Sequence, residues 1–102
     1  MARITIPFNA WSKKRLREGK KTCTSRTREY GDIGDTFIVE GKEYKIIMCV
    51  DFPTSLIIKA FWKAEGADSQ AELRRVLKSI FRGKKLPDVL WLHEFKEVSK
   101  NV

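Results

Sequence analysis

The chain has 102 residues, which suffices for one hydrophobic core and is too short for two. Hydrophobic residues make up 42% of it and charged residues 33%, a balance that excludes a disordered tail and predicts a single domain over residues 1–102. The 21 lysines and arginines outnumber the 13 acidic residues and give a net charge of +8, so nucleic acid is the first partner to consider.

Membrane insertion, secretion and metal binding are not indicated by the sequence. The apolar run at residues 46–50 is far shorter than the roughly 20 residues that a membrane-spanning helix needs. The N-terminus lacks the apolar core of a signal peptide, so we expect a cytoplasmic protein without membrane contact. Cys23 and Cys49 form no C-x-x-C pair and His93 is the only histidine. We therefore expect no metal site and no cofactor.

The first elements in chain order are a strand and a helix. Residues 2–6 alternate between apolar and polar side chains, which predicts a strand. Residues 10–18 contain good helix formers, with Asn9 as a candidate N-cap and Gly19 as the residue that ends the helix.

A hairpin and a second helix are predicted in the middle of the chain. Residues 36–39 and 44–50 have strand character, and Gly41-Lys42 between them predicts a turn. The sequence Pro-Thr-Ser at residues 53–55 is expected to end the second strand and to cap a helix that runs through Ala64.

The last third of the chain predicts a third helix and a final strand. Ser69 and Glu72 form a capping box, after which apolar residues recur at helical spacing with basic residues between them. Those basic residues form either a solvated face or a strip of phosphate contacts. Residues 89–95 follow as a strand. This order does not alternate as in a doubly wound parallel sheet, so we expect an α+β fold: a small mixed β-barrel, closed or nearly closed, flanked by helices.

Residues 19–26, Gly-Lys-Lys-Thr-Cys-Thr-Ser-Arg, concentrate the groups that could carry chemistry. In an extended chain Lys21 and Ser25 face one side and Thr24 and Arg26 the other, but a kink near Lys21 could bring both charges to one cleft. An ammonium, several hydroxyls and a guanidinium suit a phosphate or a nucleobase carbonyl. The candidate ligand-binding residues are Gly19, Lys20, Lys21, Thr22 and Arg26.

The spacing of Gly19, Lys21 and Arg26 resembles the G-x-K-x-x-x-x-R signature of the ASCH family, small domains similar in fold to the PUA RNA-binding domains. The resemblance covers nearly the whole chain, from the helix before this motif to the final strand. It implies a domain that binds RNA or a modified nucleotide in a basic cleft.

Some bacterial family members are amidohydrolases that remove the acetyl group of N(4)-acetylcytidine with a lysine, a threonine and a glutamate. The resemblance places these catalytic roles on Lys21, Thr24 and Glu65. Lys21 would act either neutral, as the base for the Thr24 hydroxyl, or charged, holding an oxyanion while Glu65 moves the proton. Hydrolysis is thus the alternative to binding alone. Nuclease activity, with Lys21 and Arg26 around a scissile phosphate, is a distant third.

Each candidate also has a purely structural interpretation. Lys20 and Lys21 could be solvated cations at the negative end of a helix dipole. The threonines of the motif could simply be strand formers, and Glu65 a surface residue near a helix end. His93, on a predicted strand, is more typical of a hydrogen-bonded core residue than of a catalyst.

Overall fold

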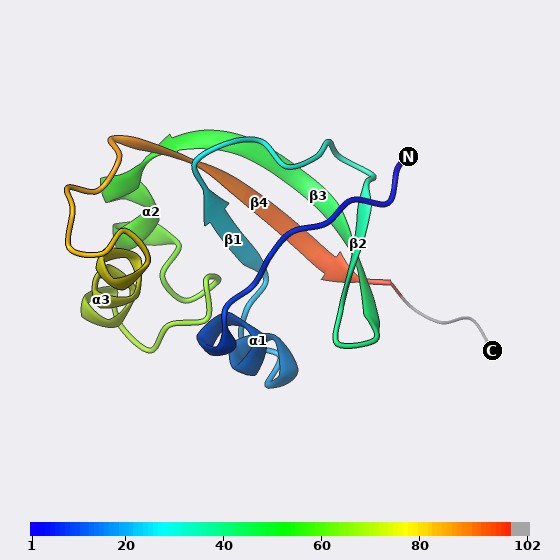
Figure 1. The fold of residues 1–102 in the computed structure, drawn as a ribbon, viewed down its shortest axis with the longest axis horizontal. Coiled ribbons are helices and arrows are strands. Elements are labelled where there is room, and N and C mark those ends of the chain that lie inside the picture. Colours follow the sequence, from blue (N-terminus) through cyan, green and yellow to red (C-terminus); the bar gives the residue numbers. More distant parts are fainter. Residues whose placement is uncertain (99–102) are drawn as a thin grey trace.

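A four-stranded antiparallel sheet forms the frame of the molecule (Figure 1). The structure is a computed structural model, and it describes residues 1–98. The strands are β1 (Cys23–Arg26), β2 (Thr36–Val39), β3 (Lys42–Pro53) and β4 (Val89–Glu97), and their order in the sheet is β1-β4-β3-β2. The helices are α1 (Ala10–Arg17), α2 (Thr54–Ala60) and α3 (Gln70–Ile80). Within residues 1–98, no helix is both long and apolar enough to cross a bilayer.

The sheet curls into a half-barrel, whereas the sequence suggested a closed or nearly closed mixed barrel (Figure 1). The outer strands β1 and β2 are only four residues long and do not pair with each other. The strand expected at residues 2–6 makes one isolated parallel bridge, between Arg3 and Thr36. Pro7 has no amide hydrogen to continue such a ladder, and the chain turns instead into α1. The α+β class is confirmed, and barrel closure is not seen in the described residues.

Both ends of α1 lie close to their predicted positions. Asn9 Oδ1 accepts a hydrogen bond from the amide of Ser12 at 2.8 Å, as an N-cap should. Gly19 adopts a φ of +72°, and the amides of Gly19 and Lys20 donate to carbonyls in the last turn of the helix, each at 3.0 Å. This is the Schellman arrangement that a left-handed glycine permits. The helix therefore ends immediately before the segment that carries the candidate site.

The predicted hairpin is confirmed. β2 and β3 pair antiparallel, with Val39 opposite Lys42. The turn lies one residue earlier than the predicted Gly41-Lys42, because Lys42 already pairs in β3; its two residues, Glu40 and Gly41, have φ values of 50° and 81°. Two consecutive positive φ angles define the type I′ turn, whose twist matches that of the flanking strands.

The second helix differs from its prediction at both ends. α2 begins at Thr54 without a side-chain cap, because its N-cap residue is Pro53, whose side chain has no acceptor; the Thr54 hydroxyl donates to the carbonyl of Pro87. The helix ends at Ala60, and residues 61–66 form turns instead of continuing it. The third helix begins as predicted, since Ser69 Oγ accepts from the Glu72 amide at 3.0 Å.

Buried apolar side chains form two clusters, one at each end of the sheet. The first joins α2 and α3 to β1 and β4, and includes Leu73, Leu77 and Leu92. The second joins α1 and the N-terminal segment to β2, β3 and β4, and includes Phe37 and Phe95. Figure 1 shows the same division, with α2 and α3 at one end of the sheet and the β2–β3 hairpin at the other.

Candidate functional site

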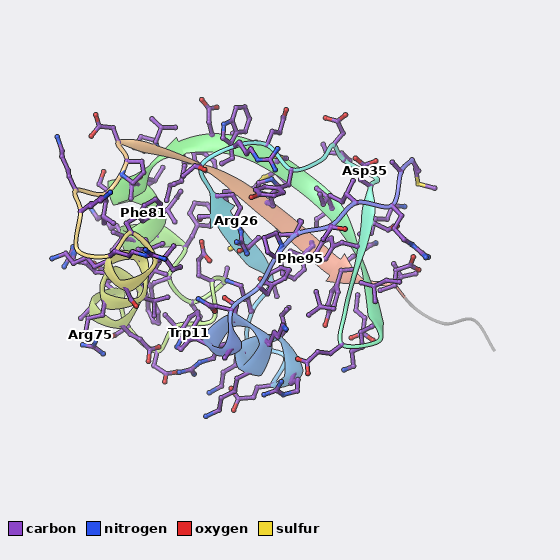
Figure 2. All side chains as sticks on the ribbon, in the orientation of Figure 1. Trp11, Arg26, Asp35, Arg75, Phe81 and Phe95 are labelled. Atoms are coloured by element: carbon purple, nitrogen blue, oxygen red, sulfur yellow. The ribbon has the colours of Figure 1, made fainter. Side chains whose placement is uncertain are left out.

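A cavity of about 550 Å³ lies where the two apolar clusters meet. Its walls come from the segment before α1, from α1, from β1 and from the apolar face of α3. Figure 2 shows three of its lining residues around this space: Trp11 of α1, Arg26 of β1 and Phe81 at the end of α3. A cavity of this volume accommodates a ligand of nucleoside size.

A buried ion pair forms part of the cavity wall. Lys21 Nζ lies 2.9 Å from Glu65 Oε1 and 3.0 Å from the carbonyl oxygen of the same residue. The two side chains are only 2% and 4% exposed. Ser25 Oγ donates to the second carboxylate oxygen of Glu65, and Lys21 Nζ lies 5.7 Å from the centre of the Trp11 ring. Because every one of these groups has a partner, the pair can exist away from water.

A kink just before β1 brings Lys21 to the cavity. The amides of Thr22 and Cys23 both donate to the carbonyl of Ala64, at 2.7 and 3.1 Å. Successive amides of a regular strand point in opposite directions, so two bonds to one oxygen require a bend in the chain. Lys21 and Arg26 therefore line the same cavity, as the sequence analysis anticipated for a kink at this point.

The turn that carries Glu65 depends on the glycine that follows it. Gly66 has a φ of +98°, and a Cβ added there would lie 2.9 Å from Arg15 Cβ and 3.1 Å from Lys21 Cβ. A side chain at this position would be strained and would push the turn away from α1. Glycine thus permits the close approach that sets Glu65 against Lys21.

Thr24 and Arg26 face the cavity, and their side chains have no hydrogen-bond partner among residues 1–98. Thr24 is 3% exposed, and among residues 1–98 its hydroxyl has no hydrogen-bond partner. The Arg26 guanidinium carbon lies 5.0 Å from the centre of the Phe8 ring. The Arg26 Nε is buried and also unpartnered in the described part of the chain. Both side chains are therefore free to bind a ligand.

The other predicted ligand-binding residues lie outside the cavity. Gly19 ends α1, and Lys20 is exposed and lies 3.9 Å from Asp68 at the surface. Thr22 is exposed as well. Of the predicted set, the structure brings together Lys21, Thr24, Arg26 and Glu65, and for Lys20 it supports the interpretation as a solvated cation.

Sequence reasoning missed several residues of the cavity. It treated Ser25 only as a hydroxyl of the motif, although strand alternation placed it on the same side as Lys21 and could have indicated their shared partner. Phe8, Tyr30 and Phe81 also line the cavity. No local pattern marked these three aromatic residues, because only the packing of distant segments brings them to one space.

The cysteines do not offer a thiolate to this site. Cys23 belongs to the motif but is 1% exposed in the core, and burial raises the pKa of its thiol far above the ordinary value. Burial also raises the pKa of Cys49, to about 11. Both thiols are therefore protonated near neutral pH, and Thr24 is the better candidate for a nucleophile in this segment.

His93 is a hydrogen-bonded core residue, as interpreted from the sequence. Its side chain is completely buried, and Nε2 accepts a hydrogen bond from the amide of Tyr30 at 3.0 Å. Nδ1 lies 3.1 Å from the carbonyl of Trp91 and therefore carries the proton. The neutral imidazole thus ties Tyr30, a cavity residue, to β4.

We expect His93 to make the stability of the protein fall in mildly acidic solution. Burial lowers the pKa of His93 below its ordinary value of 6.5. As the pH falls below that value, the unfolded chain binds a proton that the folded protein still excludes. The free energy of unfolding should then decrease by at most about 1.4 kcal/mol per pH unit, down to the folded-state pKa.

Urea unfolding of wild type and of His93→Gln between about pH 8 and pH 5 measures this contribution. Glutamine does not titrate, so the difference in unfolding free energy between the two proteins should change with pH. Parallel pH profiles of the unfolding free energy in the two proteins would show that His93 is not the source of the pH dependence.

The protein is a small α+β half-barrel with a cavity between its sheet and its helices. No family model and no curated protein matches the sequence. Solved structures do match, among them an ASCH domain from Lactobacillus crispatus JV V101, at a TM-score of 0.71 and 13% identity over 94% of this chain and 77% of that chain. The chain therefore has an ASCH-like fold, as the sequence motif indicated.

Two further structures are similar over most of their length. The hypothetical protein PH0355 has a TM-score of 0.64 and 18% identity, covering 89% of this chain and 94% of that chain. Protein EF3133 from Enterococcus faecalis V583, of the family model DUF984, has a TM-score of 0.59 and 19% identity, covering 86% and 70%. At these identities the likeness concerns the fold alone.

Proposed function

We propose that the cavity binds an acylated nucleoside, with N(4)-acetylcytidine as the model substrate, and hydrolyses its amide to cytidine and acetate. The observation that carries this proposal is the buried pair of Lys21 and Glu65 in the wall of the cavity that Thr24 also lines. Removing two charges from water is costly, and a hydrophobic pair would commonly be at least as stable. A charged pair beside a ligand cavity is therefore better explained by chemistry than by stability.

The cavity also suits the binding of a planar base. Phe8, Trp11 and Tyr30 supply aromatic surface, and α3 supplies an apolar wall. Aromatic side chains stack on nucleobases regardless of sequence. Apart from the Tyr30 hydroxyl and the Trp11 indole N–H, the polar side chains of the lining come from Glu65, from the segment between Lys21 and Thr27, and from residues 9 and 12. A ligand with one flat apolar body and one polar edge fits this division.

The geometry favours one of the two roles considered for Lys21. Its ammonium donates to the Glu65 carboxylate, so we assign it as the charged group that holds the developing oxyanion. Glu65 accepts the proton of Thr24 as the hydroxyl oxygen attacks the acetyl carbon. The C–N bond then breaks, the amine nitrogen takes the proton from Glu65, and water hydrolyses the acyl-threonine ester to acetate. Ser25 holds the second oxygen of Glu65 and so positions it.

The direct test is to incubate the purified protein with N(4)-acetylcytidine and to quantify both products by chromatography. Cytidine and acetate should appear in equal amounts, and a chelator should leave the rate unchanged, because side chains fill every proposed role. A folded protein that releases no acetate would show that the cavity is a binding site only.

RNA binding is a second candidate function, and it rests on the outer face of α3. Exposed basic residues line this face while the opposite face borders the cavity, and Figure 2 shows Arg75 pointing away from the helix. No ion pair is found for these residues within the described part of the chain: Arg74, Arg75, Lys78 and Arg82.

Affinity for single-stranded RNA should therefore fall steeply with salt. Arg75→Gln is expected to lower the slope of log affinity against log salt by about 0.7, the value for losing one phosphate contact. Arg3→Gln removes the same charge from an exposed site and serves as the control. Fluorescence anisotropy at several salt concentrations measures the slope for each variant. Equal slopes in the two variants would argue against α3 as the RNA-binding face.

A further inference from the structure

The charges that line the cavity do not balance. Three of the lining residues in the described chain are charged: Lys21, Arg26 and Glu65. Lys21 and Glu65 neutralise each other at 2.9 Å. One positive charge, that of Arg26, therefore has no counter-charge in direct contact within the described chain, and it lies in a largely apolar space.

In the part of the chain that the structure describes, Arg26 makes no bond that would compensate for the burial of its Nε. Within residues 1–98 its guanidinium has neither an ion pair nor a hydrogen bond, and its Nε is fully buried. Burial lowers the pKa of Arg26 from its ordinary value, and the more distant Glu65 carboxylate only opposes this effect. A half-buried guanidinium whose Nε is fully buried and makes no hydrogen bond carries a free-energy cost that a bound anion would reduce.

The position of Arg26 is well suited to such an anion. Its guanidinium lies over the ring of Phe8, 5.0 Å from the ring centre, which restrains the side chain while leaving its donors free. Its backbone belongs to β1, where Arg26 is paired opposite Trp91 of the central strand β4. A planar guanidinium held in this way can donate two parallel hydrogen bonds to a phosphate.

We propose that the ligand of this cavity carries a phosphate and that Arg26 binds it, so that the natural ligand is a nucleotide, free or within RNA, and not a nucleoside. This inference rests on the proposed function and narrows its substrate class. A nucleoside fills the aromatic part of the cavity but leaves Arg26 unpaired. A nucleotide can place its base against the aromatic walls and its phosphate against the Arg26 guanidinium.

Calorimetric titration with cytidine, with its 5′- and 3′-monophosphates and with the dinucleotide CpC tests this inference. These probes lack an acyl group and cannot be turned over during the measurement. At least one phosphate-bearing probe should bind wild type at least ~10-fold more tightly than cytidine, equivalent to about 1.4 kcal/mol. A preference for a monophosphate alone identifies a free nucleotide, and an equal preference for CpC identifies a phosphodiester.

Arg26→Gln should bring the affinities for the phosphate-bearing probe and for cytidine to within about twofold, because glutamine keeps polarity without charge. Arg26→Lys should retain part of the preference for the phosphate-bearing probe, since lysine keeps the positive charge but lacks the two parallel N–H donors of the guanidinium. Arg3→Gln lowers the net charge equally and should retain the full preference. If Arg26→Gln does not fold, the wild-type ratio and the Arg26→Lys ratio decide the question.

The outcomes separate this inference from the function on which it rests. Equal binding of cytidine and all phosphate-bearing probes by wild type would overturn the role of Arg26 and leave the nucleoside cavity standing. A preference that survives in Arg26→Gln would also overturn it. Failure of every probe to bind would overturn both proposals.

Discussion

Replacing Lys21, Thr24 or Glu65 with alanine is expected to lower kcat/KM for N(4)-acetylcytidine hydrolysis by at least ~100-fold in each case. Lys21→Ala removes the charge that holds the oxyanion, Thr24→Ala the nucleophile, and Glu65→Ala the group that moves the proton. Initial rates of cytidine release, with each variant checked by circular dichroism, measure the effect.

The motif itself supplies matched controls. Lys20→Ala and Thr22→Ala change the same residue types one and two positions away, outside the cavity, and should retain near wild-type activity. The double variant Lys21→Ala/Thr24→Ala should be little worse than either single variant, because groups that act as a unit lose their effects together. Full activity in Thr24→Ala would refute the catalytic assignment and leave a binding site.

The second large effect should be on stability. Glu65→Ala leaves the Lys21 ammonium, 2% exposed, without its carboxylate partner. Breaking a buried pair from one side costs about 3–5 kcal/mol, because an uncompensated charge stays buried. Urea unfolding should show a loss of this size, whereas Arg17→Ala, at the surface pair with Glu40, should cost less than about 1 kcal/mol.

Replacing both partners separates the cost of the unpaired charge from the loss of contacts. In Lys21→Met/Glu65→Leu neither charge remains, so most of the stability lost in Glu65→Ala should return. The same protein should be inactive towards N(4)-acetylcytidine. A double variant as unstable as Glu65→Ala would show that the pair stabilises the fold in its own right, and the argument from its cost would fail.

Glu65→Ala is expected to affect both the rate of hydrolysis and the stability of the fold. A rate loss in Glu65→Ala could reflect partial unfolding as well as lost chemistry, so rates must be compared on the folded fraction. Thr24→Ala avoids the problem, because the Thr24 hydroxyl has no hydrogen-bond partner among the described residues. Thr24 is therefore the cleanest single test of hydrolysis.

Local chain chemistry determined much of this protein from sequence alone. The cap at Asn9, the helix end at Gly19, the hairpin with a turn around Gly41 and the capped start of α3 at Ser69 were all predicted, because their physical causes lie within a few neighbouring residues. The candidate residues Lys21, Thr24 and Arg26 stood out for the same reason, as polar groups of one short motif.

Interactions between distant segments decided the rest. The half-barrel stays open because β1 and β2 are short and unpaired with each other, and no local pattern shows which strands will meet. Glu65 reaches Lys21 only because Gly66 lets a turn 44 residues away in sequence pack against α1. Phe8 and Phe81 become cavity walls through the same packing. A sequence motif identifies the candidate reactive groups. Their burial and their hydrogen-bond and ion-pair partners, which determine their charge states and their access to a ligand, arise only when the chain folds.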